Sequence, residues 1–436
     1  MTNKKVLILA YDFPPLNSVG AQRPYSWYKY FSKSGAIPTV VTRHWEGVKY
    51  GSTDSIVLKT NQAVETEQTN LGDIIRVPYR QNYRDKLMAK FGLKYAGLRR
   101  LLTLFYNVFD LFTTIFDSKR ELYFASKEYL KLHKVDYIIA TGEPYILFKY
   151  ASQLSEEFGI PWHADYRDDW IGNHIREHNK SLMNRFMNTL ESFFEKRYLK
   201  SAKSFSTVAD QIARNIESRT AIHNYVIIEN GSDLEVVNRV EYNEYPSEFI
   251  ITYTGLMYDF DYYKTFALGF KSFMEKCSDP SKVKLRFVGI DAVMNSAVQE
   301  AYRTREAFPN HVEIIGHVPF EKAVLYQKMS CVLLNLIAGD PAKGFIGAKC
   351  SVYAATKRPI LSVPLVKNKE SNFFRNRDIH TIAISPDEVC SFLLQRFDIF
   401  EKKANLETSI TDREIYLLSR EYQAQLLVNF LFKNDV

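Results

Sequence analysis

The segment Val6-Leu-Ile-Leu-Ala10, continued by Tyr11-Asp-Phe-Pro-Pro15 and Leu16-Asn-Ser-Val-Gly20-Ala-Gln-Arg23, decides the fold. A continuous aliphatic run of this length is typical of a strand buried on both faces, as in a parallel sheet. The two prolines end the strand, and Gly20 allows a close backbone approach before a helix predicted over residues 24–34. Pockets in doubly wound sheets form at the carboxyl ends of strands. The segment is therefore either an ordinary strand–loop–helix turn or the edge of a binding site.

Strands and helices alternate through both halves of the chain. The alternation runs from the N-terminus to about residue 237 and restarts with a strand over residues 249–255. This order is typical of parallel sheets covered by helices on both faces. A length of 436 residues is too great for one hydrophobic core, and the polar stretch 237–248 is the predicted linker. We expect an α/β protein with two Rossmann-like domains, at 1–237 and 249–410, and a long helix within 411–436.

The composition limits the possible partners. The net charge of +7 is mild for 436 residues, so nucleic acid is not expected as a partner. The four cysteines are widely spaced without a CxxC pair, which predicts neither a metal site nor a disulfide framework. The first residues show no signal-peptide pattern, so we expect a cytoplasmic protein.

One segment, at about residues 84–116, departs from the alternation. Six basic residues lie between Arg84 and Arg100, and an apolar, aromatic run follows over residues 101–116. This run is about four helical turns long, whereas a bilayer span needs roughly 20 residues. Two interpretations stay open. The segment lies in a membrane interface with its basic end toward anionic headgroups, or it is a helical insertion packed on its own domain.

Charged residues follow two strands of the first half. Glu143 follows one strand, and the next strand and its loop read His163-Ala-Asp165-Tyr-Arg167-Asp168-Asp-Trp170. Carboxylates at the end of a sheet need partners. Arg167 either pairs with Asp165 or Asp168 and fixes the loop, or these carboxylates hold or deprotonate a substrate hydroxyl. In the second case Trp170 offers a stacking face, and His163 is a weaker candidate for a general base.

Glycines and lysines gather after strands of the second half. One strand ends at Gly255, and residues 339–349 hold three glycines and two lysines before a helix predicted over residues 350–356. Glycines, a helix N-terminus and a lysine together can cradle a diphosphate. A surface loop without a ligand is the alternative. The segment is not a P-loop, because the GxxxxGK[ST] spacing is absent.

In order and spacing, these motifs resemble the family 4 glycosyltransferases of the GT-B fold, in their bacterial surface-polysaccharide branch. The similarity is carried by residues 11–23, by Thr141-Gly-Glu-Pro144, by the segment 159–170, and by Lys349 with Tyr353 in the second half. It covers most of the chain outside residues 61–120. No single motif is decisive, so the resemblance depends on their order and spacing.

The resemblance implies two Rossmann-like domains facing a cleft, with the C-terminal helix crossing back to the first. It implies a metal-independent hexosyltransferase that retains anomeric configuration and needs no cofactor. A nucleotide-sugar (NDP-sugar) would be the donor, and a glycan or lipid-linked molecule the acceptor, in lipopolysaccharide or capsule synthesis at the inner face of the cell membrane. We assign Asp165 and Asp168 to catalysis, Arg167, Trp170, His163 and Glu143 to the acceptor, and Gly20, Gly255, Lys264, Asp340, Gly347, Lys349 and Ser351 to the donor.

Three positions depart from the family's pattern. A glutamate of the family binds the nucleotide ribose, and the matching residue here is Val352. An earlier glutamate of the family, its usual partner, corresponds to Gly344. Either Asp340 or Ser351 therefore contacts the ribose in place of these glutamates, or the ribose contact is missing. The family's arginine after the Gly255 strand is also not evident, and Lys264 is the nearest substitute. A GT-B-fold nucleotide-sugar epimerase and a non-catalytic scaffold subunit therefore stay open as alternatives.

Overall fold

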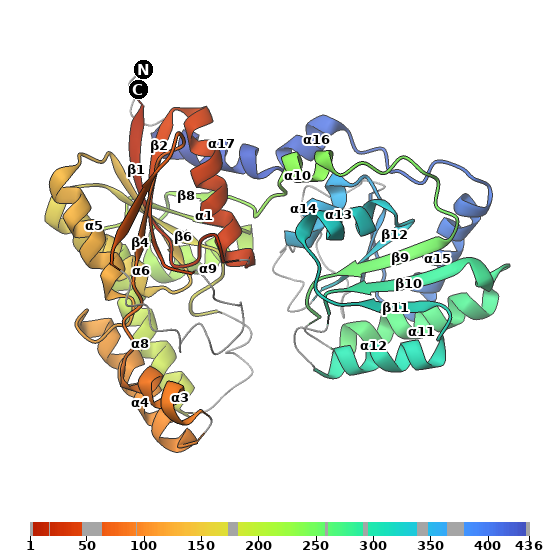
Figure 1. Ribbon diagram of the computed structural model, residues 1–436, viewed down its shortest axis with the longest axis horizontal. Coiled ribbons are helices and arrows are strands. Elements are labelled where there is room, and N and C mark those ends of the chain that lie inside the picture. Colours follow the sequence, from red (N-terminus) through yellow and green to blue (C-terminus); the bar gives the residue numbers. More distant parts are fainter. Residues whose placement is uncertain are drawn as a thin grey trace. The chain divides into compact units, whose positions relative to one another are not determined.

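The computed structural model describes residues 3–16, 18–45, 63–92, 94–172, 182–257, 260–290, 295–337, 348–363 and 379–432. The chain divides into two compact units (Figure 1). The first consists of Met1–Ile228 with Gln423–Val436, and the second of Glu229–Tyr422. Residues 229–237, which the sequence placed at the end of the first domain, contribute Val237 to a core cluster of the second unit.

The first unit is built on an eight-stranded sheet in the order β3-β4-β2-β1-β5-β6-β7-β8. All neighbours are parallel except β3 and β4. The strands are β1 (Lys4–Leu9), β2 (Ala36–Arg43), β3 (Glu65–Gln68), β4 (Asp73–Val77), β5 (Tyr137–Gly142), β6 (Trp162–Tyr166), β7 (Ser204–Thr207) and β8 (Tyr225–Ile227). The helices are α1 (Val19–Tyr30), α3 (Tyr83–Phe91), α4 (Ala96–Phe112), α5 (Arg120–Leu132), α6 (Ile146–Phe158), α8 (Leu182–Leu199), α9 (Asp210–Thr220) and α17 (Arg420–Phe432), with a 3₁₀ turn at Phe31–Ser34.

Helices cover both faces of this sheet, as the apolar run of β1 predicts. Leu7 and Leu9 belong to a core cluster with residues of α5, α6 and α8. Val6 and Ile8 belong to a second cluster with residues of α1 and α17. Because side chains alternate across a strand, a strand buried on both faces needs apolar residues at every position.

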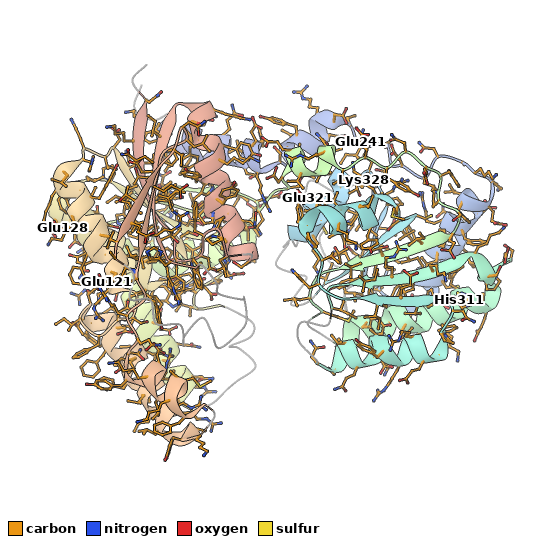
Figure 2. The ribbon with its side chains drawn as sticks, in the orientation of Figure 1. Glu121, Glu128, Glu241, His311, Glu321 and Lys328 are labelled. Atoms are coloured by element: carbon orange, nitrogen blue, oxygen red, sulfur yellow. The ribbon has the colours of Figure 1, made fainter. Side chains whose placement is uncertain are left out.

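The second unit repeats this architecture with six parallel strands in the order β11-β10-β9-β12-β13-β14. Lys328, the last residue of α13 (Phe320–Lys328), donates a hydrogen bond to the carbonyl of Val240, which follows α10 (Leu234–Arg239), at 2.7 Å (Figure 2). The strands are β9 (Phe249–Thr254), β10 (Val283–Val288), β11 (Val312–Ile315), β12 (Val332–Leu336), β13 (Ile360–Val363) and β14 (His380–Ile382). The helices are α10 (Leu234–Arg239), α11 (Phe260–Lys276), α12 (Ser296–Ala307), α13 (Phe320–Lys328), α14 (Ala348–Ala355), α15 (Pro386–Glu401) and α16 (Asp412–Leu417), with a 3₁₀ turn at Pro280–Lys282.

Each sheet has one point at which the strand order reverses. In the first unit this point lies between β1 and β5, and in the second between β9 and β12. Connections leave the two neighbouring strands in opposite directions there, which opens a crevice at their carboxyl ends. These two edges are where each unit is expected to hold a ligand.

Three predicted elements differ from the structure. The first helix begins at Val19 rather than at residue 24, because the Ser18 hydroxyl caps it by accepting from the Ala21 amide at 3.0 Å. The short antiparallel strand β3 was not predicted, since its residues are all polar and exposed. The single C-terminal helix is two helices, α16 and α17.

The break between α16 and α17 has a local cause. The chain pairs there with Ser232, whose amide donates to the Leu418 carbonyl and whose carbonyl accepts from the Arg420 amide, both at 2.9 Å. Gly231 has a φ of +65°, and a Cβ on it would lie 2.8 Å from the Arg420 nitrogen. A glycine is therefore required for this close approach.

Candidate functional sites

A buried ion pair lies at the switch point of the first unit. Arg23 of α1 and Asp165 of β6 are 3% and 0% exposed, and the Arg23 Nη2 lies 2.6 Å from the Asp165 Oδ1. The Thr141 and Ser206 hydroxyls also donate to this carboxylate, at 2.8 and 2.7 Å. Arg23 donates in addition to the Ile228 carbonyl at 2.8 Å. The pair thus fastens α1 to β5, β6, β7 and the segment after β8.

The surroundings of Asp165 keep it ionised. Burial alone would raise the pKa of this carboxyl, but the Arg23 charge and the hydrogen bonds from Arg23, Ser206 and Thr141 outweigh burial and lower it. With both oxygens bonded and no exposed surface, Asp165 does not reach a substrate hydroxyl. The structure therefore does not support the predicted catalytic role of Asp165, which instead holds α1 in place against the strands through Arg23.

Two further acceptor-side predictions are also corrected. His163 is fully buried, with its ring nitrogens 2.8 Å from the hydroxyl oxygens of Ser204 and Ser206, and burial lowers its pKa to about 3. It therefore stays neutral inside the sheet layer. Trp170 is buried with its ring stacked between Tyr145 and Tyr198, at centroid distances of 4.9 and 6.4 Å. Neither face of the indole is open to a sugar.

The remaining predicted residues of this unit gather at the carboxyl ends of β5 and β6. Arg167 lies 3.3 Å from Asp168 and 3.7 Å from Glu143, and both carboxylates keep almost half of their surface exposed. A Cβ on Gly20 would clash with the Arg167 Nη1 and would lie 2.6 Å from the Asp12 Oδ2. The glycine thus leaves room for the guanidinium beside the first turn of α1.

Asp12 is the member of this cluster that sequence reasoning missed. Its Oδ2 accepts from the Ser18 hydroxyl at 3.5 Å, and burial raises its pKa, opposed by the nearby charge of Arg167. The signal was its place directly after β1, at the strand whose end borders the switch point. We use the name acidic–arginine cluster for the group formed by Asp12, Glu143, Arg167 and Asp168. Carboxylates and a guanidinium so arranged can hold sugar hydroxyls or exchange a proton with one.

The switch point of the second unit carries a lysine on α14. Lys349 donates to the Tyr253 hydroxyl at 2.7 Å and to the Leu256 carbonyl at 3.1 Å. Its Nζ also lies 4.1 Å from the centre of the Tyr253 ring. A Cβ on Gly255 would lie 3.2 Å from the Lys349 Cε. The lysine therefore lies over the glycine that follows β9.

The electrostatics of Lys349 favour an anion as its missing partner. Burial lowers the pKa of this lysine to about 7. Within the described parts of the chain, no carboxylate forms an ion pair with it. A lysine desolvated without a counter-charge gains its proton back when an anion binds beside it.

Gly255 and Gly289 contribute space at this edge. Their φ angles are +88° and +75°, and a Cβ on Gly289 would lie 3.9 Å from the Gly255 Cα. Their amides donate to the Val288 and Ile315 carbonyls at 2.7 and 2.8 Å. The two amides therefore continue the sheet and do not point to a ligand.

The other predicted donor residues are less well placed. Ser351 is buried on α14. Lys264 is exposed on α11, and no described contact joins it to Lys349. Asp340 and Gly347 lie outside the described residues.

Val352 belongs to the core rather than to an open site. It is 8% exposed and packs in a cluster with Val237, Ile415 and Leu418. Introducing a glutamate by Val352→Glu is therefore expected to destabilise the second unit by about 1–3 kcal/mol, because a carboxylate is buried without a partner. Urea unfolding with Val352→Met as the control measures this. An unchanged unfolding midpoint together with tighter nucleotide binding would show that the side chain opens into a ligand site.

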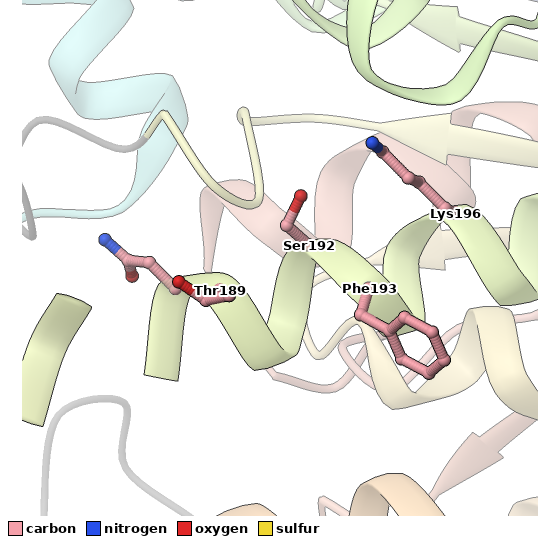
Figure 3. A pocket seen from close by; sticks show the side chains of 5 residues that line it. Thr189, Ser192, Phe193 and Lys196 are labelled. Carbon is pink, nitrogen blue, oxygen red and sulfur yellow. The ribbon is translucent and has the colours of Figure 1, made fainter. Parts of the chain in front are cut away.

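A separate hollow lies on one face of α8 in the first unit (Figure 3). It is open, has a volume of about 450 Å³ and is lined by Asn188, Thr189, Ser192, Phe193 and Lys196. None of the predicted site residues lines it. The two switch points, rather than this hollow, therefore carry the candidate chemistry.

No protein-family model matches the chain, and no curated protein matches it either. Solved structures do match. A sucrose-phosphate synthase from Thermosynechococcus elongatus covers 99% of this chain and 98% of its own, with a TM-score of 0.61 at 14% identity. Anabaena HepE in complex with UDP-glucose covers 98% of this chain and 99% of its own, with a TM-score of 0.57 at 12% identity. A glycosyltransferase from Rickettsia africae covers 100% of both chains, with a TM-score of 0.58 at 11% identity. The chain has two α/β units with parallel sheets and matches these structures over almost its full length. It therefore has the GT-B fold.

Proposed function

We propose that this protein is a glycosyltransferase that takes a sugar from an NDP-sugar. The observation that carries the proposal is Lys349, a lysine without a described counter-charge that lies over Gly255 at the switch point of the second unit. Anabaena HepE, a structural neighbour at 12% identity, has been solved with UDP-glucose. A nucleoside diphosphate suits an edge that offers one positive charge and a floor of glycines without side chains.

The chemistry follows from the charge that develops on the leaving group. As the sugar–phosphate bond breaks, negative charge grows on the diphosphate, and Lys349 stabilises it without moving. Tyr253 and the Leu256 carbonyl hold the ammonium group in place. A fixed positive charge is more effective than a mobile one, because little reorganisation is needed during the reaction.

The acidic–arginine cluster is the proposed acceptor side. Glu143, Asp168 and Arg167 offer exposed or half-buried groups to sugar hydroxyls, and Asp12 lies close to Arg167. We further propose that the enzyme is a metal-independent hexosyltransferase that retains anomeric configuration. The acceptor would be a glycan or lipid-linked molecule in cell-surface polysaccharide synthesis, on the cytoplasmic side of the membrane.

A panel of NDP-sugars, followed by mass spectrometry with and without EDTA, tests this function. Release of the nucleoside diphosphate from one donor, unchanged by EDTA, is the expected result. Conversion of the donor to an isomer would support the epimerase instead. Absence of binding to every donor, measured by calorimetry, would support the scaffold.

A further inference from the structure

Helix α4 turns an apolar stripe toward solvent. Its exposed apolar side chains recur every three or four residues, so they share one face of the helix. Leu101 and Phe112 are each 63% exposed. A surface helix of a globular domain normally directs such a stripe into the core. The members of this stripe are Leu98, Leu101, Phe105, Phe109 and Phe112.

The stripe is free because α4 is held by other groups. The Tyr106 hydroxyl accepts from the Tyr83 amide at 3.2 Å and joins α4 to α3. The Asp110 carbonyl accepts from Lys149 at 2.8 Å, and the Leu111 carbonyl accepts from the Tyr198 hydroxyl at 2.6 Å. These contacts fix the helix on α6 and α8. The insertion is therefore packed on its own domain along one side and uncovered along the other.

The uncovered side is preorganised. The rings of Phe105 and Phe109 stack at 4.1 Å, and Phe116, beyond the helix, contacts Phe109 edge-on at 6.3 Å. Phe112 packs edge-on against Phe194 of α8 at 4.8 Å. The aromatic side chains thus already contact one another or α8 on the surface, which limits the conformational entropy lost when another apolar phase covers them.

The exposed charged residues of α3, α4 and their connection are all basic. The only acidic residue of α3, Asp85, is buried and accepts from Asn82, Tyr79 and Arg84, so it does not add negative charge to the surface. On α4, Asp110 is half-buried. Exposed basic residues surround the α3–α4 connection, and these are Lys86, Lys90, Lys94 and Arg100.

We propose that the α3–α4 hairpin, residues 83–112, docks this protein on an anionic lipid bilayer. The α4 stripe enters the boundary between headgroups and acyl chains, and the lysines of the hairpin lie against lipid phosphates. No described helix is long and apolar enough to cross a membrane. The 17 residues of α4 would lie along the surface over about 25 Å.

A lipid surface fits the hairpin better than a second copy of the chain. In a two-fold dimer the same patch faces itself, so the lysines of both copies would approach one another. An anionic bilayer supplies both the apolar phase and the opposite charge. The inference does not depend on the proposed transferase activity, although docking there would bring the first unit to a lipid-linked acceptor.

Vesicle co-sedimentation of the full chain tests the proposal. Binding is expected to phosphatidylglycerol–phosphatidylcholine vesicles and to be much weaker to phosphatidylcholine alone. Leu101→Ser/Phe105→Ser/Phe109→Ser is expected to lower partitioning about tenfold or more. The control Leu268→Ser/Phe320→Ser removes exposed apolar side chains of the second unit and should bind as the parent does. Equal losses in the two variants would overturn the proposal.

The charge requirement is tested in the same assay. Lys86→Glu/Lys90→Glu/Lys94→Glu is expected to abolish the preference for anionic vesicles, whereas Lys271→Glu/Lys276→Glu/Lys403→Glu makes the same change in net charge at exposed positions of the second unit. If the second triple variant loses as much binding as the first, net charge rather than the hairpin is responsible, and the proposal fails.

A tryptophan reporter locates the contact. All four native tryptophans are buried, so Phe105→Trp introduces an indole that lipid can reach. Brominated acyl chains are expected to quench it, and not the control Phe320→Trp. The opposite result has two parts: no quenching by lipid, and a dimer of the parent protein in sedimentation velocity that is lost in the triple serine variant. Together they would show that the stripe binds a second copy of the chain. Binding of the panel of NDP-sugars is measured on the same samples, so vesicle binding without binding of any donor would leave the docking in place and reject the transferase.

Discussion

Replacing Arg23 by methionine is expected to lower the free energy of unfolding of the first unit by about 3–5 kcal/mol. The substitution leaves Asp165 buried with two hydroxyl donors but no counter-charge. A carboxylate in that position either stays charged at a high desolvation cost or takes up a proton. Urea unfolding followed by circular dichroism measures the loss.

Two further variants show whether the ion pair is the cause. In Arg23→Met/Asp165→Leu both charges are gone, so part of the lost stability is expected to return. Lys131→Met removes an exposed ion pair with Glu128 and is expected to cost less than about 1 kcal/mol. An Arg23→Met variant that is no less stable than Lys131→Met would contradict the positioning role.

The same pair predicts a dependence on acid. Because the pKa of Asp165 is lower in the folded state than in the unfolded state, the unfolded chain binds a proton first as pH falls. The stability contributed by this group is complete above the ordinary aspartate pKa and is lost as pH falls through the lower folded value. In Asp165→Asn this part of the acid dependence should be absent.

The buried strands and the positions of the loops could be predicted from the sequence, because both depend on local patterns, whereas the exposed polar strand β3 could not. The aliphatic run of β1, its two prolines and the polar residues after β5 and β6 lie where they were expected. The roles within the β6 segment could not be predicted. His163 and Asp165 lie on one face of β6, where both contact Ser206 of β7. Arg23, the ion-pair partner of Asp165, is 142 residues away in the sequence. That pairing depends on which helix covers the face, and a single sequence does not encode it visibly.

At the Lys349 site, too, some features could be predicted from the sequence and others could not. Lys349 and Gly255 were recognised from glycine and lysine spacing, and the structure brings them together. Two further features depend on the register between strands. The Tyr253 hydroxyl accepts a hydrogen bond from Lys349, and the amides of Gly255 and Gly289 donate to carbonyls of neighbouring strands. Register is set by packing across the whole sheet, so local patterns do not reveal it.

Replacing Lys349 by methionine is expected to weaken binding of the preferred NDP-sugar about 10- to 100-fold, the value of one hydrogen bond to a charged group. The methionine keeps an unbranched apolar chain as far as the ε position, the atom that contacts Gly255, so the packing there is retained. Calorimetry measures the affinity, and thermal unfolding confirms the fold. Lys271→Met, an exposed lysine on α11, is the control and should bind as the parent does.

The pH dependence of binding separates a role for the Lys349 charge from a role in packing. Burial lowers the pKa of Lys349 to about 7, and a bound diphosphate raises it because the charged form is then favoured. Affinity should therefore be highest below pH 7 and fall by up to tenfold per unit above it, until the pH reaches the raised pKa of the complex. An NDP-sugar is the right probe, because its diester phosphates do not titrate in this range. Lys349→Arg keeps its proton throughout and should bind without this dependence. If the parent protein shows the same flat profile as Lys349→Arg, the lysine is already charged in the free protein, and the proposal that a diphosphate supplies its missing partner fails.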